Sequence, residues 1–190
     1  MSAAWAVLVA CGKGERFGAD TDTAFLTLGS RPVITYSLAA FEQCADVAGV
    51  VVVAPKDRVE NVRVMVQMYG FSKVRKIIAG TTQRQSSVLA GLKMLDENAT
   101  LVVIHDASRP CVNSAQVGEV IKSARRNGSG ILALRVAETP KVSAKGGKVQ
   151  SSLNPDELWL AVYPQAFQAA ALLKGYEQAQ KKKVVLSDDS

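Results

Sequence analysis

The sequence is short of the features that cross-link, export or anchor a protein. Its 190 residues include three cysteines, an odd number without metal-ligand spacing, which indicates neither a disulfide framework nor a zinc site. Apolar stretches such as residues 5–11 fall far short of the roughly 20 residues that span a bilayer. No basic segment precedes this stretch and glycine-rich, charged residues follow it, so it is no secretion signal. We expect a cytoplasmic protein that does not bind membranes.

Aromatic residues are also few, at 6% of the chain, and no basic stripe is interleaved with them. The 23 Lys and Arg residues exceed the 17 Asp and Glu residues, for a net charge of +6. A positive balance favours anionic partners, and phosphorylated small molecules fit this composition better than nucleic acid does. With 48% apolar residues, a chain of this length forms a core without metal or disulfide, which indicates one domain over residues 1–190.

Short apolar runs alternate with longer segments of helical periodicity. The runs lack in/out alternation, which is typical of strands buried on both faces of a parallel sheet. These runs span residues 6–10, 50–54, 101–104 and 130–134. Helical spacing predicts helices over residues 32–44, 82–95, 113–126 and 164–183. The alternation predicts an α/β fold of three layers, Rossmann-like, with ligands beyond the carboxyl ends of the strands.

Residues 138–153 interrupt this pattern. Gly146 and Gly147 lie between two short strand-like runs, 141–143 and 148–150, which predicts a projecting β-hairpin. An isolated hairpin is marginally stable in water, so we expect it to pack against another surface, such as a second subunit.

Glycines follow the first predicted strand, at positions 12, 14 and 18. They allow the backbone to approach a ligand closely, and bare amides at such a turn can hold phosphate oxygens. The spacing excludes both the dinucleotide-binding fingerprint and the P-loop. A tight turn without a ligand is the alternative, and Arg16 argues against it because a forked cation suits a polyphosphate.

Asp106 and Arg109 follow the third predicted strand. A carboxylate at a strand's carboxyl end can ligate Mg²⁺, which takes one or two carboxylates together with substrate phosphates. Arg109 offers a further anion contact. His105 is the only histidine, and we expect a hydrogen-bonded core residue in preference to a catalytic base.

The turn over residues 80–88 is rich in hydroxyls. Helix capping explains one of Thr81 and Thr82. It does not explain Arg84 and Ser87, one helical turn apart, which could line a pocket.

Together these segments resemble the 2-C-methyl-D-erythritol 4-phosphate cytidylyltransferase family. The order of motifs carries the resemblance: Gly12-x-Gly14-x-Arg16, Arg84-Gln85-x-Ser87-Val88, His105-Asp106-Ala107-x-Arg109-Pro110, Pro164-Gln165-Ala166-Phe167 and Ser187-Asp188-Asp189. The resemblance covers essentially the whole chain. It implies a nucleotide-diphospho-sugar transferase (GT-A-like) fold and Mg²⁺-dependent transfer of a cytidylyl group from CTP to methylerythritol phosphate, in isoprenoid biosynthesis. It also implies a homodimer built through a hairpin arm over about residues 138–157.

The resemblance also assigns roles to residues. It places Mg²⁺ on Asp106, and the sugar phosphate near Asp106, Arg109 and Thr139 of the partner subunit. The implied catalytic residues are Arg16, Thr23 and Asp106. The implied nucleotide-binding residues are Ala10, Cys11, Gly12, Lys13, Gly14 and Arg16 for the triphosphate, and Gly80, Thr81, Thr82 and Ser87 for the cytosine.

Four positions depart from the family pattern. Thr23 replaces a triphosphate-bridging Lys, Pro155 an Arg, Tyr163 a Thr and Thr82 an Asp. Losing one preorganised charge contact costs about 2.7–4 kcal/mol. Two alternatives therefore stay open: an impaired homologue acting as a nucleotide-binding or dimeric interaction module, and a cytidylyltransferase for another polyol phosphate such as ribitol 5-phosphate. Lys13 or Arg31 substituting for the missing Lys is a further hypothesis.

Overall fold

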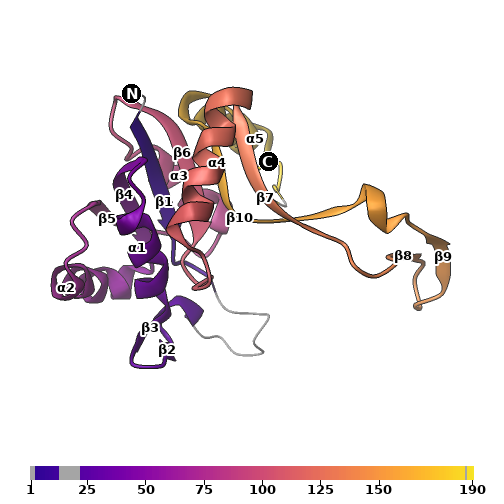
Figure 1. The fold of residues 1–190 in the computed structure, drawn as a ribbon, viewed down its shortest axis with the longest axis horizontal. Helices are drawn as coiled ribbons and strands as arrows, with labels where there is room; N and C mark the ends of the chain where they lie inside the picture. The colour runs from indigo at the N-terminus through magenta and orange to yellow at the C-terminus, as the bar shows by residue number, and fades with distance from the viewer. Residues whose placement is uncertain (1–2, 13–21, 187) are drawn as a thin grey trace.

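A six-stranded sheet of order β5-β4-β1-β6-β10-β7 forms the centre of the molecule (Figure 1). The computed structural model describes residues 3–12, 22–186 and 188–190. β1 pairs in parallel with β4 and β6, and β4 pairs in parallel with β5. The strands are β1 (Ala3–Val9), β4 (Val47–Ala54), β5 (Val74–Ala79), β6 (Ala99–Asp106), β7 (Ser129–Arg135) and β10 (Trp159–Gln168).

Helices cover both faces of this sheet, which confirms the predicted three layers. One face packs against α1 (Val33–Gln43), α2 (Val59–Tyr69) and α4 (Ser114–Asn127), and the other against α3 (Arg84–Leu92) and α5 (Ala169–Lys182). None of the helices among the described residues is long and apolar enough to cross a membrane.

Successive residues of the central strands point into opposite core layers. Leu8 and Val52 join the layer beneath α1, whereas Val7 and Val53 join the layer beneath α3, and all four are fully buried. Burying each such side chain contributes about 1.5–3 kcal/mol. This two-sided burial is the reason for the uninterrupted apolar runs, and it confirms the predicted strands over residues 6–10, 50–54 and 101–104.

The ends of α4 follow from capping chemistry. The Asn113 side chain accepts a hydrogen bond from the Gln116 amide at 2.9 Å, and the Gln116 side chain accepts from the Asn113 amide at 3.1 Å. Gly128 ends the helix in the left-handed region at φ +87°. The predicted helix over residues 113–126 is thereby confirmed, including its cap.

The sheet is mixed, so the prediction of a parallel sheet was wrong. β10 runs antiparallel between β6 and β7. Its second half, residues 164–168, was predicted as the start of the last helix, which instead begins at Ala169. Gln165 pairs with Ile104 on one side and Ile131 on the other. Pairing with two neighbours overrides the weak strand propensity of an Ala- and Gln-rich run.

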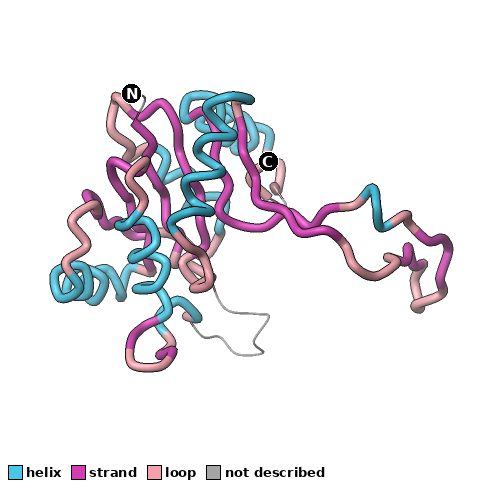
Figure 2. The backbone as a smooth tube through the Cα atoms, in the orientation of Figure 1, coloured by secondary structure: helices cyan, strands magenta, loops and turns pink. Residues whose placement is uncertain are grey.

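β7 leaves the body of the molecule and leads into an arm. Leu134 is 59% exposed, so the predicted two-sided burial of residues 130–134 is wrong, because β7 is the edge strand. Beyond it, β8 (Lys141–Ser143) and β9 (Val149–Ser152) form the predicted hairpin, with Gly146 and Gly147 at φ +86° and +78°. Figures 1 and 2 show this arm extending away from the body.

Several elements were not predicted. They are α2, β5, the short pair β2 (Thr27–Leu28) and β3 (Arg31–Pro32), and the 3-10 turns η2 (Thr23–Phe25), η3 (Lys56–Arg58) and η4 (Pro155–Glu157).

Candidate active site

The turns that carry the predicted site meet at one edge of the sheet. Asp106 ends β6 in register with Val9, and the Ala107 amide donates to the Val9 carbonyl at 2.9 Å. On the other side of β1, the Ala10 amide donates to the Val53 carbonyl at 2.7 Å. The described part of the glycine turn, Ala10–Gly12, therefore lies beside Asp106, as the prediction of a common site requires.

The turn at Gly80 touches the glycine turn directly. The Gly80 amide donates to the Ala54 carbonyl at 2.8 Å. A Cβ at Gly80 would lie 2.4 Å from the Cys11 Sγ and 2.8 Å from the Ser87 Oγ, so only glycine fits without displacing its neighbours. Burial raises the pKa of the Cys11 thiol, which keeps it protonated. Cys11 thus serves as a packing residue between the two turns.

Ser87 shapes the turn on which the threonines stand. It is fully buried, and its Oγ accepts from the Thr81 amide at 2.9 Å and donates to the Thr81 carbonyl at 3.1 Å. Thr81 and Thr82 are exposed. Ser87 therefore fixes the backbone at residue 81, and the neighbouring threonines face solvent.

A charged cluster surrounds Asp106. The Arg84 Nε donates to one carboxylate oxygen at 3.0 Å and the Arg109 Nε to the other at 3.2 Å. The terminal nitrogens of Arg84 donate to both oxygens of Asp189, at 2.9 and 2.8 Å. The Asp189 side chain is fully buried and also accepts from the Tyr176 hydroxyl. We call Arg84, Asp106, Arg109, Tyr163 and Asp189 the Asp106 cluster.

Electrostatics holds Arg84 firmly in its charged form. Burial alone would lower the pKa of Arg84, but the hydrogen bonds that Arg84 donates to Asp189 and the charges of Asp106 and Asp189 raise this pKa above its usual range. Fully or partly buried, charge-assisted bonds of this kind are stronger than neutral ones. Arg84 is thus a fixed bridge between two carboxylates.

Tyr163 lies against both guanidinium groups. Its ring centroid is 4.9 Å from the Arg84 Cζ and 5.1 Å from the Arg109 Cζ, within the range of cation–π attraction. Burial, with the nearby charge of Asp189, raises the pKa of Tyr163, so its hydroxyl remains protonated. An aromatic ring therefore replaces solvent beside two like charges.

His105 supports the same loop from within the core. It is fully buried, its Nε2 donates to the Arg109 carbonyl at 3.2 Å, and the Ser37 Oγ donates to that carbonyl at 3.2 Å. Its Nδ1 has no hydrogen-bond partner among the described residues. Burial lowers the pKa of His105 to about 4, so the ring is neutral at physiological pH. This environment fits the expected core residue.

Other predicted residues lie on further elements or outside the part of the chain that the structure describes. Thr23 begins η2, and Thr139 lies in the arm between β7 and β8 (Figure 1). Arg31, proposed as a substitute cation, stacks on Tyr36 at 4.4 Å. Lys13, Gly14 and Arg16 are outside the described residues, so the predicted phosphate contacts of that loop stay predictions.

Asp189 and Tyr176 were missing from the predicted site. Asp189 is 105 residues from Arg84 in sequence, and neither periodicity nor spacing links them. The Asp188-Asp189 pair near the end of the chain was the available signal, because two adjacent carboxylates are rarely buried without a partner.

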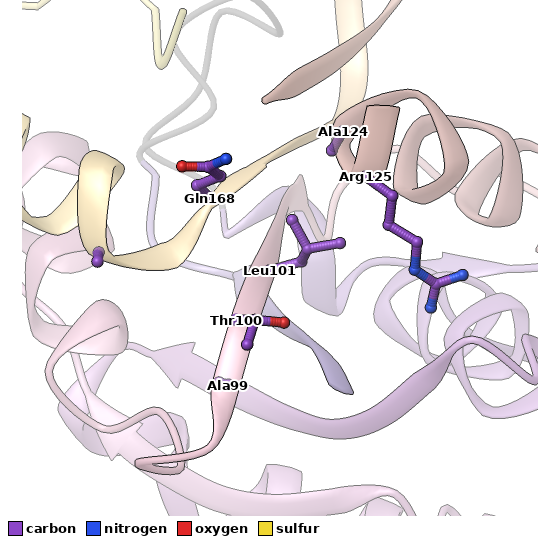
Figure 3. A pocket seen from close by; sticks show the side chains of 7 residues that line it. Ala99, Thr100, Leu101, Ala124, Arg125 and Gln168 are labelled. Carbon is purple, nitrogen blue, oxygen red and sulfur yellow. The ribbon is translucent and has the colours of Figure 1, made fainter. Parts of the chain in front are cut away.

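A cavity of about 560 Å³ lies at the opposite end of the sheet (Figure 3). Ala99 and Leu101, at the amino end of β6, line it together with Ala124, Arg125 and Gln168. Arg125 bonds Asp46 at 2.6 Å. The cavity's lining contains no carboxylate, thiol or imidazole, so the chemistry gathers at the Asp106 end.

The chain is similar throughout to one family of enzymes. The profile of the 2-C-methyl-D-erythritol 4-phosphate cytidylyltransferase family matches residues 4–190. The cytidylyltransferase of Halalkalibacterium halodurans is 34% identical over 184 residues, 97% of this chain and 80% of the relative. That of Desulforamulus reducens is 36% identical over 185 residues, 97% of this chain and 79% of the relative. The crystal structure of the 4-diphosphocytidyl-2C-methyl-D-erythritol synthase from Anaerococcus prevotii matches with a TM-score of 0.87 and 25% identity, covering 99% of this chain and 79% of that one.

Proposed function

Because the chain belongs to the 2-C-methyl-D-erythritol 4-phosphate cytidylyltransferase family, we propose that it transfers a cytidylyl group from CTP to 2-C-methyl-D-erythritol 4-phosphate. The reaction releases pyrophosphate and belongs to the MEP pathway of isoprenoid biosynthesis. The observation that carries the proposal is the match over residues 4–190, with Arg84, Asp106 and Arg109 at one strand edge.

The proposed cytidylyl transfer does not require a general base. A phosphate oxygen of the acceptor attacks the α-phosphorus of CTP, a new P–O bond forms, and the bond between the α-phosphorus and the bridging oxygen breaks as pyrophosphate leaves. The attacking oxygen is already ionised, so no base removes a proton. Positioning and charge neutralisation supply most of the catalysis in such transfers. A neutral His105 and a charged Arg84 are consistent with this requirement.

Nucleotide binding is proposed at the two neighbouring turns. The backbone at Ala10–Gly12 would face the triphosphate, because glycine lets the backbone approach a ligand closely and no atom of the described residues lies within 4 Å of a Cβ built at Gly12. The exposed Thr81 and Thr82 would face the cytosine, on a backbone held by Gly80 and Ser87.

Magnesium is proposed on Asp106. The described part of the chain contains no group of three or more His, Cys, Asp or Glu side chains that could hold a metal ion by themselves. Asp106 offers hard oxygen donors, but each oxygen already accepts from a guanidinium. Because Mg²⁺ takes one or two carboxylates plus substrate phosphates, these residues fit an ion that arrives on the triphosphate. Such an ion would neutralise phosphate charge during transfer.

Acceptor binding is proposed at Arg109, with a second subunit contributing through the arm. The Arg109 side chain is 37% exposed, so it can reach a phosphate at the surface while Asp106 orients it. Leu134, Trp159 and Leu160 are each more than half exposed where the arm leaves the body. We propose that a homodimer covers these side chains and brings Thr139 of the partner subunit to the sugar phosphate.

Pyrophosphate release tests the proposal. Purified protein is incubated with CTP, Mg²⁺ and either methylerythritol phosphate or ribitol 5-phosphate, beside an Asp106→Ala control. We expect release with methylerythritol phosphate that falls by about 10²–10³ in the control. Release with ribitol 5-phosphate alone would assign another acceptor, for which the Tyr163 ring against Arg109 is the relevant departure. Stabilisation by CTP without release would identify a nucleotide-binding module instead.

A further inference from the structure

The last described residues form a strap across the body of the protein. We define this C-terminal strap as residues 184–186 and 188–190. It leaves α5 after Lys183, a left-handed residue at φ +55°. Val184 and Val185 are 48% and 89% exposed, and Leu186 is the apolar side chain of the strap that packs against the core layer beneath α3. The position of the strap therefore depends on Leu186 together with specific polar contacts.

Gln85 supplies two of these contacts. Its Nε2 donates to the Val184 carbonyl at 3.1 Å, and its Oε1 accepts from the Leu186 amide at 3.1 Å. A carboxamide is suited to this task because it carries both a donor and an acceptor. Gln85 therefore binds the strap backbone much as a neighbouring strand would.

The strap in turn delivers a buried carboxylate to the cluster. Asp189 follows three residues after Leu186 and binds both terminal nitrogens of Arg84. Arg84 precedes Gln85 in α3, so two consecutive residues at the start of this helix form hydrogen bonds to the same strap. Because Arg84 uses its remaining Nε on Asp106, the strap's position is coupled to the orientation of the Asp106 carboxylate.

We propose that Gln85 is a positioning residue for the transfer reaction: it docks the C-terminal strap, so that Asp189 fixes Arg84 against Asp106. The proposal rests on the proposed function, and Gln85 touches neither substrate nor reacting atoms. Without Gln85 the strap keeps the hydrogen bonds from Gln165 to Asp188 and from Tyr176 to Asp189. It loses both bonds at Val184 and Leu186, so the contact between Arg84 and Asp189 opens more readily.

The test compares Gln85→Ala and Gln85→Glu with Ser86→Ala. Among the described residues, the Ser86 Oγ donates one hydrogen bond, to the Gln83 side chain at 3.4 Å, which makes Ser86→Ala a matched control. Hydrogen exchange at the Leu186 amide reports strap docking, and pyrophosphate release reports its consequence. Loss of two neutral hydrogen bonds predicts about tenfold faster exchange and about tenfold lower kcat/KM in Gln85→Ala. Gln85→Glu, which cannot donate to the Val184 carbonyl, shows the same direction of change, and Ser86→Ala shows neither.

A double variant separates positioning from general destabilisation. If Gln85 acts through Asp189, Gln85→Ala adds almost no further loss of kcat/KM to Asp189→Asn. Two results would overturn the role of Gln85 while leaving the proposed function intact, provided that the wild type is active. One is a fully additive loss of kcat/KM in the double variant, and the other is unchanged hydrogen exchange at the Leu186 amide in Gln85→Ala. Absence of pyrophosphate release by the wild type overturns the proposed function, and with it this role of Gln85.

Discussion

The Asp106 cluster and the hairpin arm are held in opposite ways. In the cluster, side chains of both signs bind one another at the edge of a buried sheet, and each carboxylate oxygen of Asp106 and Asp189 has a partner. In the arm, β8 and β9 are exposed along their whole length and pair only with each other. The body therefore contains the interactions that set its site, whereas the arm has only the pairing of its own two strands, and we propose that a second subunit covers it.

Substitutions in the two regions are expected to change the free energy of unfolding by different amounts. The Asp189 side chain is fully buried and that of Arg84 is 34% exposed, so breaking their contact leaves the Asp189 charge uncompensated. The Leu134 and Leu160 side chains lie opposite each other on β7 and β10 and face solvent, so their loss costs a single subunit little. Variants in the two regions should accordingly fail in different assays.

The largest effect is expected at Arg84. Arg84→Leu removes three charge-assisted hydrogen bonds, leaves Asp189 without a cation and leaves Asp106 with Arg109 alone. We expect turnover to fall by about 10²–10³ and the free energy of unfolding by about 2–4 kcal/mol. Arg63→Leu breaks only an exposed pair with Glu60 and leaves both quantities unchanged. Pyrophosphate release and urea denaturation measure the two changes. Equal losses of turnover and of unfolding free energy in the two variants would contradict a special role of the Asp106 cluster.

The arm is expected to show the reverse pattern. Leu160→Asp places a charge beside Leu134 where a second subunit would cover both. We expect the dimer dissociation constant to rise about 100-fold, or ~2.7 kcal/mol, while the unfolding free energy of the subunit stays within about 0.5 kcal/mol. Sedimentation velocity over a concentration series measures the first and urea denaturation the second. A monomeric wild type would contradict the proposed role of the arm.

Acid sharpens the comparison inside the body. Because burial lowers the pKa of His105 from 6.5 to about 4, the unfolded chain binds a proton more readily than the folded one between these values. The contribution of the neutral His105 to the free energy of unfolding is therefore fully present above pH 6.5. It is lost as the pH drops toward 4, which lowers the free energy of unfolding by up to about 3 kcal/mol. His105→Gln should flatten this part of the profile. Parallel denaturation profiles of the two proteins between pH 4 and 7 would contradict the neutral buried ring.

The smallest effect is expected at Tyr163. Tyr163→Leu removes the ring from both guanidinium groups, and a cation–π contribution of about 0.5–1 kcal/mol predicts a roughly two- to fivefold loss of kcat/KM. Tyr163→Phe keeps the ring and retains more activity. Steady-state kinetics of both variants decide the point, and an equal loss of kcat/KM in Tyr163→Phe and Tyr163→Leu would assign the effect to the hydroxyl group.

The part of the site that depends on the direction of the strands could be predicted from the sequence. Asp106 and the Gly80 turn each follow a buried strand, and the carboxyl ends of parallel strands share one edge. The position of Asp189 could not be predicted, because it depends on how the strap crosses α3, which only Gln85 and a few other side chains determine.

Three errors in the predicted fold, the parallel sheet, the start of the last helix and the buried β7, have one common source. β10 carries an Ala- and Gln-rich half without strand propensity, and it is a strand because β6 and β7 bind both of its edges. The same insertion makes the sheet mixed and leaves β7 as an exposed edge. Such tertiary pairing has no local trace in the sequence.

Calorimetric titration of CTP into the wild type and Asp106→Ala, each with and without Mg²⁺, tests most directly whether Asp106 receives a metal-bound nucleotide. We predict that Mg²⁺ tightens CTP binding to the wild type by at least about tenfold, or ~1.4 kcal/mol. Asp106→Ala should bind CTP equally with and without the ion. An equal gain from Mg²⁺ in both proteins would place the ion elsewhere and contradict the account.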